Sequence, residues 1–139
     1  MTARRKTVEA PRSEAPLYIA KAVQFVEEAS AAIESSRNDA AMLNAVHAAI
    51  TAADAICVAI AGRRSADPDH QRAADLLQEI GGGSQGISGH VRQLRMLLAK
   101  KNVVEYESRQ AKAKEASEAV QRAERFVDWA KQIVEAARL

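Results

Sequence analysis

The chain has 139 residues, of which 47% are hydrophobic and only 4% are aromatic, and its formal net charge is +2. This length suits one domain with a core of its own, and few aromatic residues beside abundant alanine favour packed helices over sheets. The small net charge excludes a protein that attracts polyanions through its overall field. Cys57 is the one cysteine, which excludes an intramolecular disulfide and fits a reducing cytoplasm.

The sequence carries no pattern of export or membrane insertion. No apolar run of signal-peptide type follows the basic N-terminus, and no window approaches the ~18 uncharged apolar residues of a membrane helix. We therefore expect a cytoplasmic protein that does not bind a membrane. The richness in alanine and arginine is typical of a bacterium with a GC-rich genome, or of its phage.

Residues 1–14 are polar and charged, with Pro11 among them and a surplus of two positive charges, so we expect a mobile basic tail. Residues 15–139 are expected to form a single helical-bundle domain. Apolar residues recur at steps of three and four between Ile19 and Ile33, which predicts the first helix.

The same periodicity between Leu43 and Ile60 predicts the second helix. Gly62 follows directly and is expected to end it, because glycine readily adopts the left-handed conformation that closes a helix. Asp67 and Pro68 then predict the N-cap and first position of a short third helix.

A glycine-rich loop, residues 81–86, follows the third helix, and apolar spacing over residues 87–98 predicts a fourth. The longest pattern belongs to the C-terminal helix. We expect this helix to run unbroken from about Arg109 to Ala136, with Val103 as its earliest start. The glycine-rich loop lacks the preceding strand and the final lysine of a phosphate-binding loop, so we interpret it as a connector.

These elements predict an all-α, up-and-down bundle of four to five helices, with a long C-terminal helix and no sheet. The alanine stripe of the last helix favours a homodimer through helical faces, although a protruding solvated end explains its length equally well. The residues that we expect in the core are Ile50, Ile56, Leu77, Leu94, Leu98, Val120 and Val127.

Metal and acid–base chemistry find little support in the sequence. The three histidines, His47, His70 and His90, lie in different predicted helices and none has the spacing of a zinc motif, so we expect no metal ion and no cofactor. Cys57 lies in an apolar stripe that disfavours its thiolate. We assign no catalytic residue.

A polar flank runs along the predicted second helix through His47, Thr51 and Asp54. We interpret it as a hydrogen-bonded seam between helices rather than as a catalytic site.

Residues 100–114 carry a surplus of three positive charges, and Arg92 and Arg95 precede them. Such a cluster can contact phosphates, which makes Arg95 and Lys100 candidate ligand-binding residues, and a solvated helix face is the alternative.

Residues 101–106 read KNVVEY and bring a cation, an amide, a carboxylate and a phenol together within two helical turns. With the order of helices over residues 15–138, this segment resembles the HEPN family (higher eukaryotes and prokaryotes nucleotide-binding domains). Those proteins are all-α and generally dimeric, and they act in toxin–antitoxin, phage-defence and RNA-processing systems. Their ribonuclease members carry an arginine, a polar residue and, a few residues on, a histidine at the start of a late helix.

In this chain Lys101 stands where that arginine would be, Asn102 matches the polar residue, and Tyr106 replaces the histidine. Tyrosine has an ordinary pKa near 10 and is a poor general base, and lysine offers a point charge where arginine offers a bidentate fork. The resemblance therefore implies a non-catalytic, homodimeric module that binds RNA, a nucleotide or a partner protein at Lys101, Asn102 and Tyr106. The alternatives are a ribonuclease toxin with an altered site and an unrelated helical adaptor or assembly subunit. Asn102 is also placed to cap the last helix.

Overall fold

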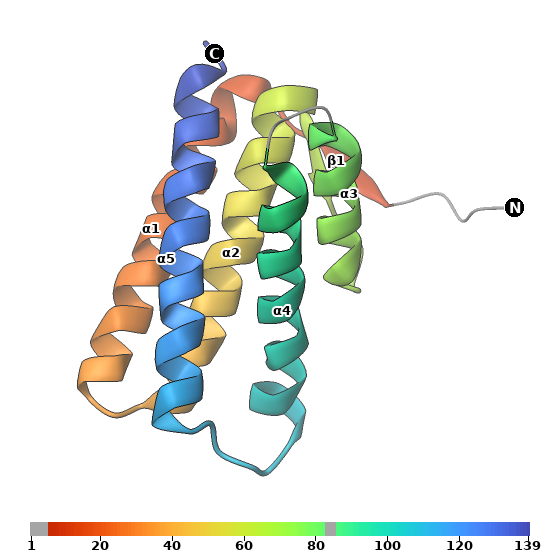
Figure 1. Ribbon diagram of the computed structural model, residues 1–139. Coiled ribbons are helices and arrows are strands. Elements are labelled where there is room, and N and C mark those ends of the chain that lie inside the picture. The colour runs from red at the N-terminus through yellow and green to blue at the C-terminus, as the bar shows by residue number, and fades with distance from the viewer. Residues whose placement is uncertain (1–5, 83–85) are drawn as a thin grey trace, which may run out of the picture.

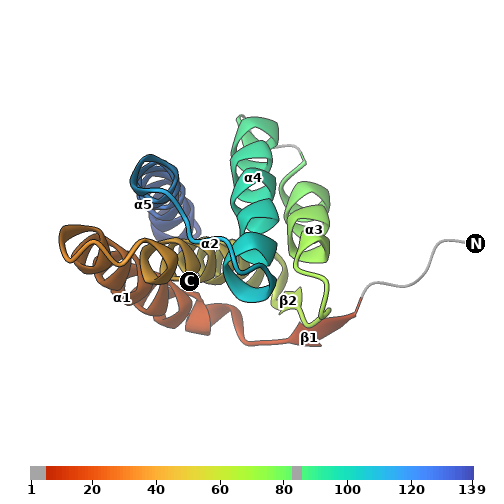
Figure 2. The same cartoon turned by 90° about the horizontal axis from the view of Figure 1, so that it is seen from below.

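The computed structural model describes residues 6–82 and 86–139. Its helices are α1 (Ala15–Glu34), α2 (Asn38–Ala61), α3 (Gln71–Gly81), α4 (Ile87–Tyr106) and α5 (Ala113–Ala136) (Figure 1). Seen along the bundle in Figure 2, α2 lies in the middle, α1 and α5 lie on one side of it, and α3 and α4 on the other. Helix α2 contacts all four of the other helices. The predicted all-α bundle with a long C-terminal helix is confirmed.

Ten of the 24 residues of α2 are alanine, which suits its central position in the bundle. Its buried residues include eight alanines together with larger side chains such as Met42, Val46 and Ile56, and such small residues let neighbouring helices approach from several sides. By length and composition α2 could cross a membrane, with a mean hydropathy of 1.7 over 18 residues, but 61% of that window is buried in the bundle. A helix buried at the centre of a helical bundle has the same length and apolar composition.

The core prediction is confirmed at six positions and wrong at one. Six of the seven expected residues are buried, among them Leu94 with no exposed surface. Ile50 is half-buried. It shares one side of α2 with His47 and Asp54, which are half-buried too, so the neighbouring helices cover this side incompletely.

The expectation of no sheet is wrong in one detail. Strands β1 (Thr7–Glu9) and β2 (Arg63–Ser65) pair in antiparallel register, with Glu9 opposite Arg63. A short 3₁₀ helix, η1 (Arg12–Glu14), follows β1, and Arg12 Nε donates a hydrogen bond of 2.6 Å to the Ala59 carbonyl. The segment predicted to be a mobile tail is therefore attached to the end of α2 over these residues. Strands of three residues are too short to show a periodic pattern.

The boundary between the last two helices differs from its prediction. Helix α4 continues through the KNVVEY segment to Tyr106, and α5 begins only at Ala113 after Lys112 in an extended conformation. Asn102 therefore lies inside α4 and does not cap α5. No glycine or proline interrupts residues 100–106, and an ion pair of 2.7 Å between Lys101 and Glu105, one turn apart, supports the helix there.

Three other predicted features have clear outcomes. Gly62 ends α2 with a φ of 66°, as predicted. Helix α3 begins later than expected, because Asp67 Oδ1 and Asp69 Oδ1 accept backbone N–H bonds in a turn that precedes Gln71. Residues 83–85 of the glycine-rich loop lie outside the described residues.

The alanine stripe of α5 is buried within one chain. Ala116, Ala123 and Ala130 have no exposed surface, and α5 packs against α1 and α2. This stripe is thus explained by close packing inside the bundle.

Candidate functional site

The three residues of the KNVVEY segment that the resemblance singles out lie along one groove. Lys101, Asn102 and Tyr106 form one wall of it on the last turns of α4, and residues 68–71 at the start of α3 form the other. We call this hollow of about 480 Å³ the α3/α4 groove. Asn102 and Tyr106 are four residues apart on a continuous helix and therefore share a face. Tyr106 is 76% exposed.

His70 is a candidate site residue that sequence reasoning missed. It lies in the turn before α3 and lines the α3/α4 groove with Lys101. The structure thus places a histidine beside the KNVVEY segment, in addition to the residues that the sequence analysis singled out. Nothing in the sequence links the two residues, because they lie 31 positions apart and meet only through the packing of α3 against α4.

The surroundings of His70 favour its neutral form. Partial burial lowers the pKa of the imidazole first, and the positive charges of Lys101 and His47 lower it further, while Glu105 and Asp69 act in the opposite direction. A neutral imidazole can accept a proton or a hydrogen bond at pH 7. His70 thus has the protonation state that a general base requires.

Lys101 is already paired in this structure. Its ammonium donates to Glu105 Oε2 at 2.7 Å, and this hydrogen bond is the main cause of the lowered pKa of the Glu105 carboxyl. Tyr106 also donates to Glu105 and lowers the same pKa. An anionic ligand in the groove must therefore compete with Glu105 for both donors.

Arg95 and Lys100, the other two candidate ligand-binding residues, lie outside the lining of this groove. Arg95 joins α4 to α3 through Asp75 at 2.6 Å and Gln71 Oε1 at 3.0 Å. Lys100 donates to Glu115 on α5 at 3.0 Å. The structure thus divides the predicted basic cluster between two sides of α4.

The polar flank of α2 has one hydrogen bond within the helix and one ring contact with α1. Thr51 Oγ1 donates to the carbonyl of His47 at 2.8 Å, which is a bond within α2. The His47 ring lies 5.9 Å from the ring of Phe25 on α1. Burial raises the pKa of Asp54 to about 7, and the charge of Arg64 opposes this rise.

The cysteine behaves as expected from its apolar surroundings. Burial raises the pKa of the Cys57 thiol to about 12, and the charge of Asp54 adds to the rise. The thiolate is therefore negligible at neutral pH. Over residues 6–82 and 86–139, no three His, Cys, Asp or Glu side chains gather in a way that could hold a metal ion.

The α3/α4 groove thus combines an ammonium group, an amide, a phenol and an imidazole on two neighbouring helices. A sequence model of the HEPN domain matches residues 15–133, and the chain belongs to the HEPN-domain family. The match covers both walls of the groove. The resemblance drawn from the KNVVEY segment and the helix order is therefore confirmed. No curated protein matches the chain.

Proposed function

We propose that this HEPN domain is a non-catalytic module that binds the phosphate of an RNA or a nucleotide in the α3/α4 groove. The observation that carries the proposal is the convergence of Lys101, Asn102, Tyr106 and His70 on one groove. A cation with neighbouring neutral donors is what a phosphate group requires. The exposed ring of Tyr106 offers a surface for a stacked base.

The size of the groove supports a ligand of this kind. Its volume of about 480 Å³ lies within the ~300–1,000 Å³ that is usual for small-molecule sites. Family membership supports the same class of ligand, because the HEPN fold is commonly associated with nucleotides or RNA. It also removes the alternative of an unrelated helical bundle.

Binding of a fluorescent single-stranded RNA and of ATP to the purified protein tests this proposal. We expect Lys101→Ala and Tyr106→Ala each to weaken binding about tenfold, with an affinity that falls as salt rises. Lys131→Ala is the matched control, because Lys131 is an exposed lysine on α5 outside the groove and should leave binding unchanged. Equal loss in all three variants, or no binding by the wild type, would contradict the proposal.

The position of His70 favours a second candidate, a ribonuclease with an altered site. A neutral imidazole there could take the proton of a ribose 2′-hydroxyl while Lys101 stabilises the charge on the phosphate. We expect no cleavage, because Lys101 is held by Glu105 and Tyr106 stands where the family's ribonucleases carry histidine. Cleavage in the presence of EDTA that is lost in His70→Gln and in Tyr106→Phe would establish the ribonuclease and refute the non-catalytic proposal.

A homodimer is part of the proposed function. The resemblance implies a dimer, because HEPN proteins are generally dimeric. The incompletely covered side of α2, which carries His47, Ile50 and Asp54, also supports a dimer. We expect a dimeric mass in sedimentation at high micromolar concentration and a monomeric mass for Ile50→Arg. A monomeric wild type would contradict this part alone. A role in a toxin–antitoxin system stays a prediction, which the neighbouring genes would test.

A further inference from the structure

A second groove lies on the other side of α4, between α4 and α5. In Figure 2, α4 stands between α3 and α5, so this groove and the α3/α4 groove flank the same helix. It consists of a hollow of about 230 Å³ beside Lys100 and Glu115 and another of about 200 Å³ beside His90 and Phe126. Arg122 lines both hollows, and we call them together the α4/α5 groove.

The rim of this groove carries positive charge without partners. Lys112, Lys114, Arg122 and Arg125 line it and form no ion pair with any described residue. Glu115, by contrast, is fully engaged. Arg109 and Lys100 both donate to it and hold the pKa of its carboxyl at about 2.

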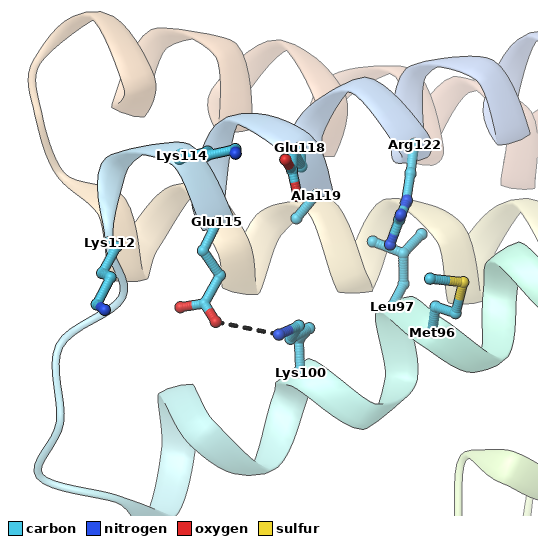
Figure 3. A pocket seen from close by; sticks show the side chains of 9 residues that line it. All are labelled: Met96, Leu97, Lys100, Lys112, Lys114, Glu115, Glu118, Ala119 and Arg122. Carbon is cyan, nitrogen blue, oxygen red and sulfur yellow. Dashed lines mark hydrogen bonds and ion pairs between the residues drawn. The ribbon is translucent and has the colours of Figure 1, made fainter.

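The floor of the groove is apolar. Figure 3 shows Arg122 extending from α5 toward Met96 and Leu97 on α4, with Ala119 beside it and the ion pair between Glu115 and Lys100 spanning the two helices. The Met96 side chain is 39% exposed, although methionine usually lies in a core. Cationic rims above an apolar floor are the complement of a helix with an apolar ridge and acidic flanks.

Other occupants fit less well. Each hollow is smaller than the ~300–1,000 Å³ of a small-molecule site and suits a single side chain. Nucleic acid would find no free ring for base stacking among the described residues of the groove, since His90 and Trp129 stack on each other with ring centroids 3.9 Å apart. A second copy would present the same positive charge in the same place and would be repelled.

We propose that the α4/α5 groove docks an acidic amphipathic helix of a partner protein. The apolar side chains of that helix enter the two hollows, and its carboxylates pair with Lys114, Arg122 and Arg125. The part of α5 that lines the groove, from Lys114 to Phe126, is about 18 Å long at 1.5 Å per residue, which matches about three turns of a partner helix. This site is separate from the α3/α4 groove, so a protein and a phosphate ligand could bind at the same time.

A designed peptide serves as the probe. It is a fluorescent helix of about 18 residues with leucines at steps of three and four and glutamates on both flanks. A second peptide carries the same leucines with lysine in place of glutamate. We expect fluorescence anisotropy to show salt-sensitive binding of the acidic peptide alone, and amide chemical-shift changes along α4 and α5. No binding, equal binding of the basic peptide, or shift changes elsewhere would overturn the proposal.

Variants locate the contact. We expect Arg122→Glu and Met96→Asp each to weaken binding of the acidic peptide about tenfold or more, because they reverse a rim charge and place a charge on the floor. Lys131→Glu has the same change of charge at an exposed position of α5 outside the groove and should change binding less than about twofold. If Lys131→Glu weakened binding of the acidic peptide as much as Arg122→Glu does, the effect would come from the net charge of the protein, and the proposal would be overturned.

Two measurements keep this result apart from the proposed phosphate site. Lys101→Ala should lose RNA binding and keep peptide binding, whereas Arg122→Glu should do the reverse. Thermal unfolding followed by circular dichroism confirms that each variant is folded, which the exposed or half-buried positions of Met96 and Arg122 favour. Loss of RNA binding in Arg122→Glu with peptide binding intact would assign the groove to nucleic acid and refute the docking proposal.

Discussion

Truncation of Leu94 to alanine tests the assignment of the α4 face that packs into the bundle. The side chain has no exposed surface and belongs to the continuous core. Leu94→Ala removes three buried carbon atoms, which at about 0.8 kcal/mol each amounts to about 2.4 kcal/mol of lost transfer free energy. The cavity left behind adds to this loss, so we expect the free energy of unfolding to fall by about 2–5 kcal/mol.

Urea titration followed by far-UV circular dichroism measures this loss, provided that the slope of the transition is unchanged. Met96→Ala is the matched control on the same helix, because Met96 is 39% exposed. We expect the control to cost less than about 1 kcal/mol, since an exposed side chain leaves little cavity. A loss below about 0.5 kcal/mol for Leu94→Ala would show that this face of α4 does not carry the packing described here.

Three further variants have outcomes that follow from the structure. Asp54 has a pKa raised to about 7, so the folded state binds a proton that the unfolded state has released, and stability falls as pH rises from about 4 to above 7. Urea unfolding at pH 5 and pH 8 should show this fall in the wild type and a smaller one in Asp54→Asn. Glu115 has a pKa lowered to about 2, so it stabilises the fold above about pH 4.5 and loses that contribution as pH falls through 2. Glu115→Gln should therefore destabilise the protein at pH 7 more than at pH 2, as thermal unfolding at both values would show. Asn102→Ala should change the free energy of unfolding by less than about 0.5 kcal/mol, because Asn102 is exposed and caps no helix, while it weakens RNA binding. A large loss of stability would mean that Asn102 has a structural role instead.

The two grooves beside α4 suggest how one small domain could hold two ligands. The α3/α4 groove is one larger hollow with neutral donors around one paired ammonium, whereas the α4/α5 groove consists of two smaller hollows, is more cationic and has an apolar floor. Because α4 forms a wall of both, adjacent residues of this helix face different grooves. Lys101 faces α3, and Lys100 faces α5.

The sequence by itself determined the helices and much of the core. Apolar spacing at three and four residues is a local property of one helix, and it predicted the bundle and the unbroken course of α5. Gly62 as the end of α2 was equally predictable, because its role depends only on its own backbone conformation. The KNVVEY segment indicated the family, since a short motif in chain order requires no knowledge of packing.

Only the tertiary structure decided which side chains meet. The start of α5 was misplaced because the sequence of residues 101–106 suits the end of α4 as well as the start of α5. The structure shows that these residues belong to α4, which ends at Tyr106. The pairing of β1 with β2 and the meeting of His70 with Lys101 join segments far apart in the chain. Such contacts depend on how whole helices pack around α2, and a helical pattern records which face is buried without recording what lies against it.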